Sequence, residues 1–215
     1  MINNDNFDWN EFEAAVQFLK TGIDALYFRD VIKAATGHEI ESFNTGSLSV
    51  IAIIDDWLKN NLNLLSNLVE KKYTGRANEL GNMVEEEIRK NLSAIPNLKC
   101  AKPLLSDGKV QSTGYPDCLI EMGEIKIYAD IKTFQTKTIE SNLRSFFYQP
   151  TNKSKIHFNA PHIIIGFETE SLGGDNKSPF RLVSYKLIDL YDLKVKFKAE
   201  FNAGNLEIYS LKKLP

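Results

Sequence analysis

Residues 115–132 read Tyr115-Pro116-Asp117-Cys118-Leu119-Ile120-Glu121-Met122-Gly123-Glu124-Ile125-Lys126-Ile127-Tyr128-Ala129-Asp130-Ile131-Lys132. Polar and apolar residues alternate on both sides of Gly123-Glu124, and such alternation is typical of β-strands. A glycine in the first place of a two-residue loop favours a type II′ turn. The sequence therefore predicts a β-hairpin in which Met122 lies opposite Ile125.

This register gives the hairpin two different faces. Asp117 lies across from Asp130, and Lys132 points to the same face because it follows Asp130 by two residues. On that face Glu121 and Lys126 form an opposite-charge pair. The other face is apolar and consists of Cys118, Ile120, Ile127, Ala129 and Ile131.

The two facing aspartates repel each other, since directly opposed residues have Cβ atoms roughly 4.5–5.5 Å apart. A hard divalent cation such as Mg²⁺ offsets that repulsion, because it prefers oxygen ligands. We therefore expect a metal-dependent nuclease site at Asp117, Asp130 and Lys132. The alternative is a surface hairpin with scattered solvated charges, and the opposition of two acids weighs against it.

Pro116-Asp117, followed thirteen residues later by Asp130-Ile131-Lys132, resembles the PD-(D/E)xK nuclease signature. That superfamily contains many type II restriction endonucleases, together with resolvases and repair nucleases. The second acid here is Asp instead of the commoner Glu, which the pattern allows. The resemblance covers the hairpin and, more weakly, a helix before it.

The resemblance implies a role for each residue of the motif. Asp117, Asp130 and the backbone carbonyl of Ile131 are the expected Mg²⁺ ligands. A bound ion polarises the scissile phosphate and lowers the pKa of the attacking water. Lys132 orients that water and stabilises charge on the phosphate, and the 3′ oxygen leaves.

The superfamily often adds a glutamate from a preceding helix, four residues after a glycine. Gly81 and Glu85 have this spacing, so Glu85 is the expected additional catalytic residue. Glu79 and Glu86 are alternatives, and the acids of this segment also fit a solvated helix face.

Composition is that of an ordinary globular protein, with 43% hydrophobic and 25% charged residues. The net charge of −2 argues against an indiscriminate polyanion binder but allows a DNA enzyme with locally gathered basic residues. Cys100 and Cys118 form no disulfide framework. Without a signal peptide or a run of transmembrane length, we expect a cytoplasmic protein that does not enter the membrane.

The 215 residues are expected to form a single nuclease domain, with a helical region at 1–72 and a catalytic core at 73–215. Helices are predicted at 7–20, 23–35, from Ser47 or Ser49 to about 70, and 77–92. The apolar stripe of the third helix fits core packing, with a dimerisation seam as the alternative.

After residue 98 the pattern changes to strands. A strand pair is expected at 99–105 and 109–112, then the hairpin, a helix at 139–148, and strands at 161–168, 181–190, 194–201 and 206–211. The continuous apolar run in 161–168 suits a strand buried on both faces. The fold class is thus α/β (α+β), a restriction-endonuclease-like mixed central sheet flanked by helices, with an N-terminal helical region.

Polar and basic residues flank the hairpin on both sides, where they suit contacts to DNA bases and phosphates. The alternative for each of them is a polar loop without a ligand. The expected DNA-binding residues are Lys109, Gln111, Thr113, Gln135, Lys137, Arg144, Asn152, Lys153 and Lys155.

The expected function is that of a type II restriction enzyme: a Mg²⁺-dependent endonuclease that cuts double-stranded DNA at a short sequence. A homodimer is expected, because two strands require two active sites and a symmetric dimer matches a palindrome. A junction resolvase or DNA repair nuclease is the second interpretation. A non-catalytic DNA-binding module is the third, and the intact acids and Lys132 count against it.

Overall fold

The computed structural model divides the chain into two compact units. Tyr27–Leu193 forms the larger unit, and the residues before and after it form the smaller one. In the smaller unit are helix α1 (Trp9–Thr21) and a sheet in which β1 (Ile23–Tyr27) pairs with β7 (Lys194–Phe197). The structure describes residues 8–21, 23–135, 146–174 and 177–197.

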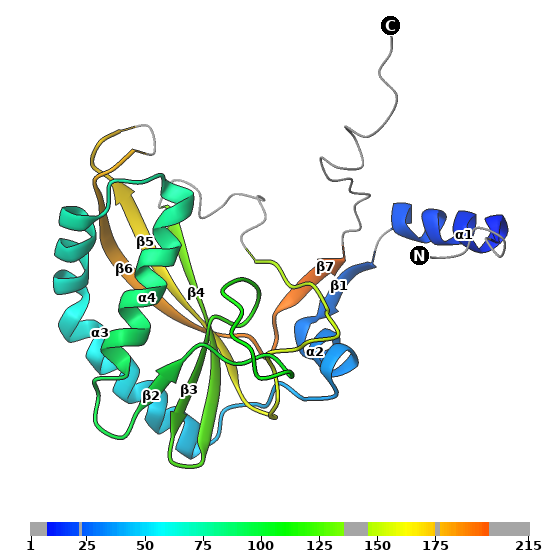
Figure 1. Ribbon diagram of the computed structural model, residues 1–215, viewed down its shortest axis with the longest axis horizontal. Helices are drawn as coiled ribbons and strands as arrows, with labels where there is room; N and C mark the ends of the chain where they lie inside the picture. The colour runs from blue at the N-terminus through cyan, green and yellow to red at the C-terminus, as the bar shows by residue number, and fades with distance from the viewer. Residues whose placement is uncertain (1–7, 22, 136–145, 175–176, 198–215) are drawn as a thin grey trace, which may run out of the picture. The chain divides into compact units, whose positions relative to one another are not determined.

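The larger unit is built on a mixed sheet, and within its described residues the strand order is β2-β3-β4-β5-β6 (Figure 1). Strands β4 and β5 are parallel, and the other neighbours are antiparallel. The strands are β2 (Lys99–Ala101), β3 (Cys118–Met122), β4 (Ile125–Gln135), β5 (His162–Ser171) and β6 (Phe180–Asp189). The helices are α2 (Phe28–Thr36), α3 (Thr45–Lys72), the short 3₁₀ helix η2 (Ala77–Glu79) and α4 (Leu80–Leu92).

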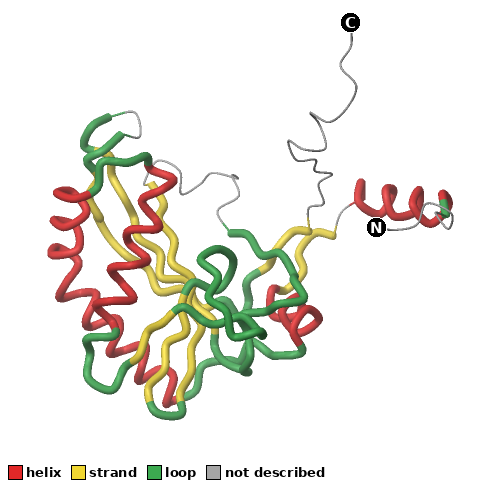
Figure 2. The backbone as a smooth tube through the Cα atoms, in the orientation of Figure 1, coloured by secondary structure: helices red, strands yellow, loops and turns green. Residues whose placement is uncertain are grey.

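The long helices α3 and α4 pack against one face of this sheet, as Figure 2 shows in red against yellow. Helix α3 contacts β6 and β4, while α4 contacts β4 and β2. The core between them is formed from all these elements and includes Ile54, Leu58, Val84, Ile88, Ile120, Ile127, Ile165 and Phe167. This α+β arrangement of a mixed sheet and flanking helices confirms the predicted fold class.

The predicted hairpin register is confirmed from its turn to Cys118. Leu119 pairs with Tyr128, Glu121 with Lys126, and Met122 with Ile125. The expected apolar face is buried: Cys118, Ile120, Ile127, Ala129 and Ile131 are each at most 4% exposed. This burial holds the register, because a slip by one residue would turn the apolar set toward the other face.

Helix α3 begins earlier than predicted. Its N-cap is Asn44, whose side chain accepts a hydrogen bond from the Ser47 amide, while Ser47 Oγ accepts one from the Asn44 amide. Ser47 thus completes a capping box inside the helix and does not start it. Along α3, Val50, Ile54, Leu58, Leu65 and Val69 are buried, which confirms core packing for most of its apolar stripe.

Several boundaries differ from the sequence-based expectations. Residues 23–27 form strand β1 and not the start of a helix, since they pair with β7; α2 follows and ends at Gly37, with φ of 77°. The strand pair expected around Asp107 is reduced to one bridge, Leu104 with Val110, because β2 pairs with β3 instead. Residues 146–148, expected to end a helix, are not helical.

The predicted strand at 161–168 is confirmed as β5, which is buried along most of its length, and 181–190 is confirmed as β6. The predictions for 206–211, for the start of the 139–148 helix and for the end of the 194–201 strand lie outside the described residues. Among the helices that the structure describes, each is too short or too polar to cross a membrane.

Candidate active site

The two motif aspartates meet at the open end of the hairpin. Asp130 lies within β4 and is buried, while Asp117 comes directly before β3. The Asp117 amide donates to the Ala129 carbonyl at 3.1 Å, which ties this residue to β4 one position off the register of the regular ladder. Asp117 Oδ2 accepts a hydrogen bond from the Ile131 amide at 2.8 Å. This bond fixes the first acid against the strand that carries the second.

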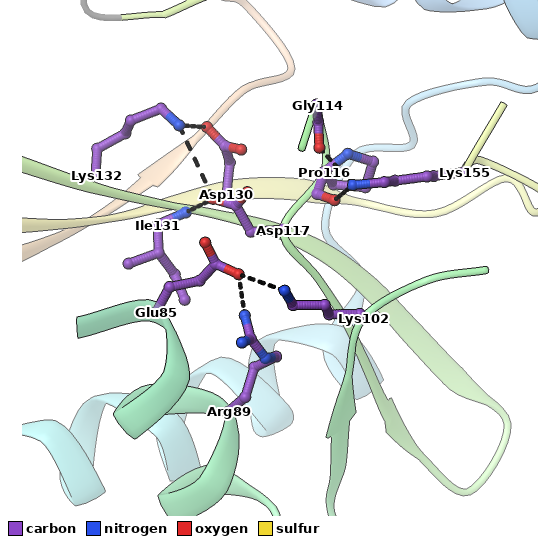
Figure 3. A network of polar contacts seen from close by, with 10 residues as sticks. All are labelled: Glu85, Arg89, Lys102, Gly114, Pro116, Asp117, Asp130, Ile131, Lys132 and Lys155. Atoms are coloured by element: carbon purple, nitrogen blue, oxygen red, sulfur yellow. Dashed lines mark hydrogen bonds and ion pairs between the residues drawn. The ribbon is translucent and has the colours of Figure 1, made fainter. Parts of the chain in front are cut away.

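Lys132 neutralises part of this negative charge. Its Nζ lies 2.6 Å from Asp130 Oδ2 and 3.9 Å from Asp117 Oδ2 (Figure 3). The lysine side chain is 34% exposed, whereas that of Asp130 is 3% exposed. The ammonium therefore lies at the boundary between the buried acid and the solvent. Sequence spacing predicted that all three side chains share one face, and the structure brings them together.

Burial raises the pKa of Asp130, the more deeply buried of the two aspartates. Desolvation, followed by the charge of Asp117, raises the pKa of Asp130 to about 7, although Lys132 acts in the opposite direction. Two carboxylates that share one site cannot both ionise at low cost. A cation with a higher charge than an ammonium would favour the doubly ionised state.

Glu85 extends from α4 toward this group, as Figure 3 shows. Its carboxylate forms an ion pair with Arg89, one helical turn later, and lies 3.8 Å from Lys102 Nζ. The Glu85 side chain is 13% exposed. Of the alternatives, Glu79 and Glu86 are both exposed. Of the three glutamates, Glu85 therefore has the position that best suits an additional active-site residue.

Lys155, expected among the DNA contacts, has a different environment. It is 5% exposed, and its Nζ donates to the carbonyls of Gly114 at 2.6 Å and Pro116 at 3.2 Å. Burial lowers the pKa of Lys155, while the charge of Asp117 raises it. The Lys155 ammonium is enclosed and already bonded, so it is not available for the predicted phosphate contact. Lys155 instead bonds the backbone of the loop that precedes Asp117.

A cluster of aromatic side chains packs behind the same loop. The Tyr115 hydroxyl and His162 Nδ1 are joined by a hydrogen bond of 2.5 Å, and both residues are buried. Burial lowers the pKa of His162 to about 3, so the ring is neutral at ordinary pH. Tyr115 also packs edge-on against Phe28 and Tyr148. Tyr115 therefore packs in the interior, and the half-buried Tyr148 packs against it.

Most described candidates for DNA contact lie on two loops that are tied together. Lys153 Nζ bonds Asp107 Oδ2 at 2.8 Å, so the loop before the hairpin lies beside the segment after it. Gln135 is half-buried near the end of β4, whereas Lys137 and Arg144 lie outside the described residues. The exposed candidates on the two loops are Lys109, Gln111, Thr113, Asn152 and Lys153.

The donor set fits a hard divalent cation. Asp117 and Asp130 provide carboxylate oxygens, and the desolvated Asp130 would gain a partner for its negative charge. In the described part of the chain, no three His, Cys, Asp or Glu side chains gather closely enough to form a metal cluster. Such a site would thus combine two carboxylates with a backbone oxygen and water, as Mg²⁺ sites in nucleotide-processing enzymes do.

Sequence reasoning missed the residues that support the acids. Arg89 was detectable, because Glu and Arg four residues apart on a helix commonly pair. Lys102 and Lys155 gave no such signal, since their partners Glu85 and Gly114 are distant in the chain. His162, which sequence reasoning did not place in the site, is completely buried and bonds the Tyr115 hydroxyl.

A mixed sheet with Pro-Asp directly before one strand and Asp-x-Lys on the neighbouring strand, and with both acids beside one lysine, defines a PD-(D/E)xK nuclease. The family model of the type II restriction enzyme MjaV family matches residues 22–213. The type II restriction enzyme MjaV of Methanocaldococcus jannaschii is 29% identical over 223 residues, which cover 96% of this chain and 94% of that enzyme. The chain belongs to the type II restriction enzyme MjaV family, a group of site-specific deoxyribonucleases.

Proposed function

We propose that this protein is a Mg²⁺-dependent endonuclease that hydrolyses phosphodiester bonds of double-stranded DNA at a short recognition sequence. The observation that carries the proposal is the position of Lys132 Nζ, 2.6 Å from Asp130 and 3.9 Å from Asp117. Two acids and one ammonium at the open end of the hairpin form the minimal apparatus for metal-assisted phosphodiester hydrolysis. Membership of a restriction enzyme family supports DNA as the substrate.

In this proposal Asp117, Asp130 and the carbonyl of Ile131 hold the ion. The chemistry supplied by a bound Mg²⁺ is polarisation of the scissile phosphate and a lower pKa for the attacking water. Lys132 orients that water and stabilises the negative charge that grows on the phosphate. Water oxygen bonds to phosphorus as the bond to the 3′ oxygen breaks, which leaves a 5′ phosphate and a 3′ hydroxyl.

Glu85 has a second role in this scheme. Its carboxylate is held by Arg89 and Lys102 and extends toward the two aspartates (Figure 3). Water molecules bound to a cation at the site would find an acceptor there. We therefore assign Glu85 to the active site, and exclude the exposed Glu79 and Glu86.

Recognition of DNA is proposed for the two loops joined by Lys153 and Asp107. Lys109 and Lys153 suit phosphate contact, while Gln111, Thr113 and Asn152 offer donors and acceptors that read base edges. Gln135, at the end of β4, and Lys137 and Arg144, which follow it in the sequence, remain proposed contacts. The active protein is proposed to be a cytoplasmic homodimer, because cutting both strands of a palindrome requires two symmetric sites.

Incubation of the purified protein with plasmid DNA, with Mg²⁺ or with EDTA, tests the proposal. We expect discrete fragments in Mg²⁺ and intact plasmid in EDTA. A preference for branched DNA over plasmid would replace the proposal with a junction resolvase. Intact plasmid under all conditions, with DNA binding retained, would replace it with a non-catalytic binding module.

A further inference from the structure

The three residues before Asp117 are each held by a buried side chain from elsewhere in the chain. Lys155 Nζ donates to the carbonyls of Gly114 and Pro116, at 2.6 and 3.2 Å. Between them, Tyr115 is bonded through its hydroxyl to His162 Nδ1 at 2.5 Å. The backbone that delivers Asp117 to the hairpin is therefore fixed from both sides, as Figure 3 shows for Lys155.

Burial of a lysine ammonium carries an unfavourable free energy of desolvation. Lysine is almost never fully buried unless it is paired, because desolvation disfavours its charge. The bonds of Lys155 are made to neutral carbonyls, and burial lowers its pKa whereas the charges of Asp117, Glu85 and Asp130 raise it. An ammonium placed there attracts the two aspartate carboxylates and fixes the backbone of one of them.

The contrast with a neighbouring lysine strengthens this point. Lys153, two residues earlier, has a side chain that is 59% exposed and an aspartate partner on the surface. The same short segment thus carries one lysine that reaches solvent and one that does not. The burial of Lys155 under Gly114 and Pro116 indicates a function at the loop.

We propose that Lys155 is a positioning residue for the metal site: it clamps the Gly114 and Pro116 carbonyls so that Asp117 stays directed at a cation shared with Asp130. The inference depends on the proposed function only in that Asp117 is a metal ligand. Lys155 touches neither the substrate nor the ion in this scheme. It acts by removing conformational freedom from one ligand, as outer residues around metal sites do.

The experiment measures Mn²⁺ binding by electron paramagnetic resonance in the absence of DNA, for the wild type and Lys155→Met. Methionine retains the length of the side chain and removes all three donors. We expect Mn²⁺ affinity to fall about 10- to 100-fold, the range found when outer-shell partners of metal ligands are lost. Lys126→Met is the control, because Lys126 is a partly buried lysine on the hairpin that is paired with Glu121, and we expect no change there.

Two further variants separate positioning from general stabilisation. In an Asp117→Asn background, adding Lys155→Met is expected to change Mn²⁺ affinity less than about twofold, because the ligand that Lys155 positions is already lost. Lys155→Arg restores donors and charge and is expected to recover part of the affinity. If Lys155→Met does not fold, as judged by thermal unfolding, Lys155→Gln takes its place under the same criteria.

Failure of this inference and failure of the proposed function are distinguishable. Unchanged Mn²⁺ affinity in folded Lys155→Met, or an equal loss in the Asp117→Asn background, overturns the positioning role while plasmid cleavage stands. A wild type that binds Mn²⁺ but leaves DNA intact overturns the proposed function and leaves the Lys155 comparison valid. A wild type that binds no Mn²⁺ overturns both.

Discussion

The carboxylate of Asp117 accepts a hydrogen bond of 2.8 Å from the backbone amide of Ile131, fourteen residues further along the chain. The bond joins the loop before β3 to the middle of β4. It occupies one carboxylate oxygen and fixes the direction of the other. The placement of the first acid thus depends on the same hairpin register that buries the apolar face.

Glu85 and Glu86 are adjacent in sequence and differ in environment, which makes a matched pair of variants. We expect Glu85→Gln to reduce cleavage at limiting Mg²⁺ by about 10- to 100-fold, because a carboxylate beside the acids is lost. Glu86→Gln alters an exposed side chain and is expected to leave cleavage unchanged. Cleavage rates measured over a range of Mg²⁺ concentrations decide the matter. Equal effects of the two substitutions would exclude Glu85 from the site.

Asp130 is expected to stabilise the metal-free protein less as pH rises. Asp130 titrates near 7 when folded, whereas an unperturbed aspartate in an unfolded chain titrates near a pKa of about 3.9. Between these values the folded state retains a proton that the unfolded state has lost. The stabilisation is therefore complete below about pH 4 and is lost as pH passes through about 7.

Thermal unfolding in EDTA from pH 4 to pH 8 measures this effect. Asp130→Asn removes the titrating group, so the melting temperature of the wild type is expected to fall relative to that of this variant as pH rises. Mg²⁺ added at pH 8 is expected to raise the melting temperature of the wild type, since a ligand that binds the folded state stabilises it. A wild-type curve parallel to that of Asp130→Asn would contradict the buried, shifted carboxyl.

Salt dependence of DNA binding tests the proposed recognition loops. Lys109 is exposed, and its loss should remove about one phosphate contact. For Lys109→Ala we expect weaker binding and a slope of log affinity against log salt that is smaller by about 1. Lys59→Ala, on the exposed side of α3, is the control and should leave the slope unchanged. Fluorescence anisotropy with a labelled duplex provides the measurement, and identical slopes for both variants would remove Lys109 from the interface.

The capping box at the start of α3 makes a prediction about folding. Asn44→Ala deletes the acceptor for the Ser47 amide and should lower the free energy of unfolding by about 0.5–2 kcal/mol. Asn60→Ala, at an exposed position inside the same helix, should be neutral or slightly stabilising. Urea unfolding of both variants compares them. A loss at Asn60 as large as that at Asn44 would show that the cap has no special role.

The hairpin was predictable because three local signals agreed. Gly123 predicted the position of the turn, and the charge pair of Glu121 and Lys126 agreed with the register that follows from it. The alternation of polar and apolar residues predicted which face of the hairpin is buried. Each of these acts between residues that are near in sequence or directly paired. The site residues Asp117, Asp130 and Lys132 were therefore placed by pattern alone.

The features that sequence reasoning missed depend on distant partners. Residues 23–27 are a strand because β7, far along the chain, pairs with them, and local propensity does not encode that pairing. The strand expected at 99–105 is shorter because it pairs with β3, and its last residue, Ala101, already lies opposite Leu119 near the start of that strand. Lys155 was assigned to DNA by its charge, whereas tertiary structure buried it beneath Gly114.

The most direct test of the account is the single-turnover rate of DNA cleavage at saturating Mg²⁺ for the wild type, Asp117→Asn, Lys132→Met and Lys126→Met. Asp117→Asn retains an acceptor for the Ile131 amide, so the fold should persist. We predict a loss of roughly 10³-fold or more for Asp117→Asn and for Lys132→Met, since an ion ligand or a charge-stabilising group is removed, and wild-type rates for Lys126→Met. Cleavage by folded Asp117→Asn or Lys132→Met within about tenfold of the wild-type rate would contradict the assignment of these residues to the chemistry.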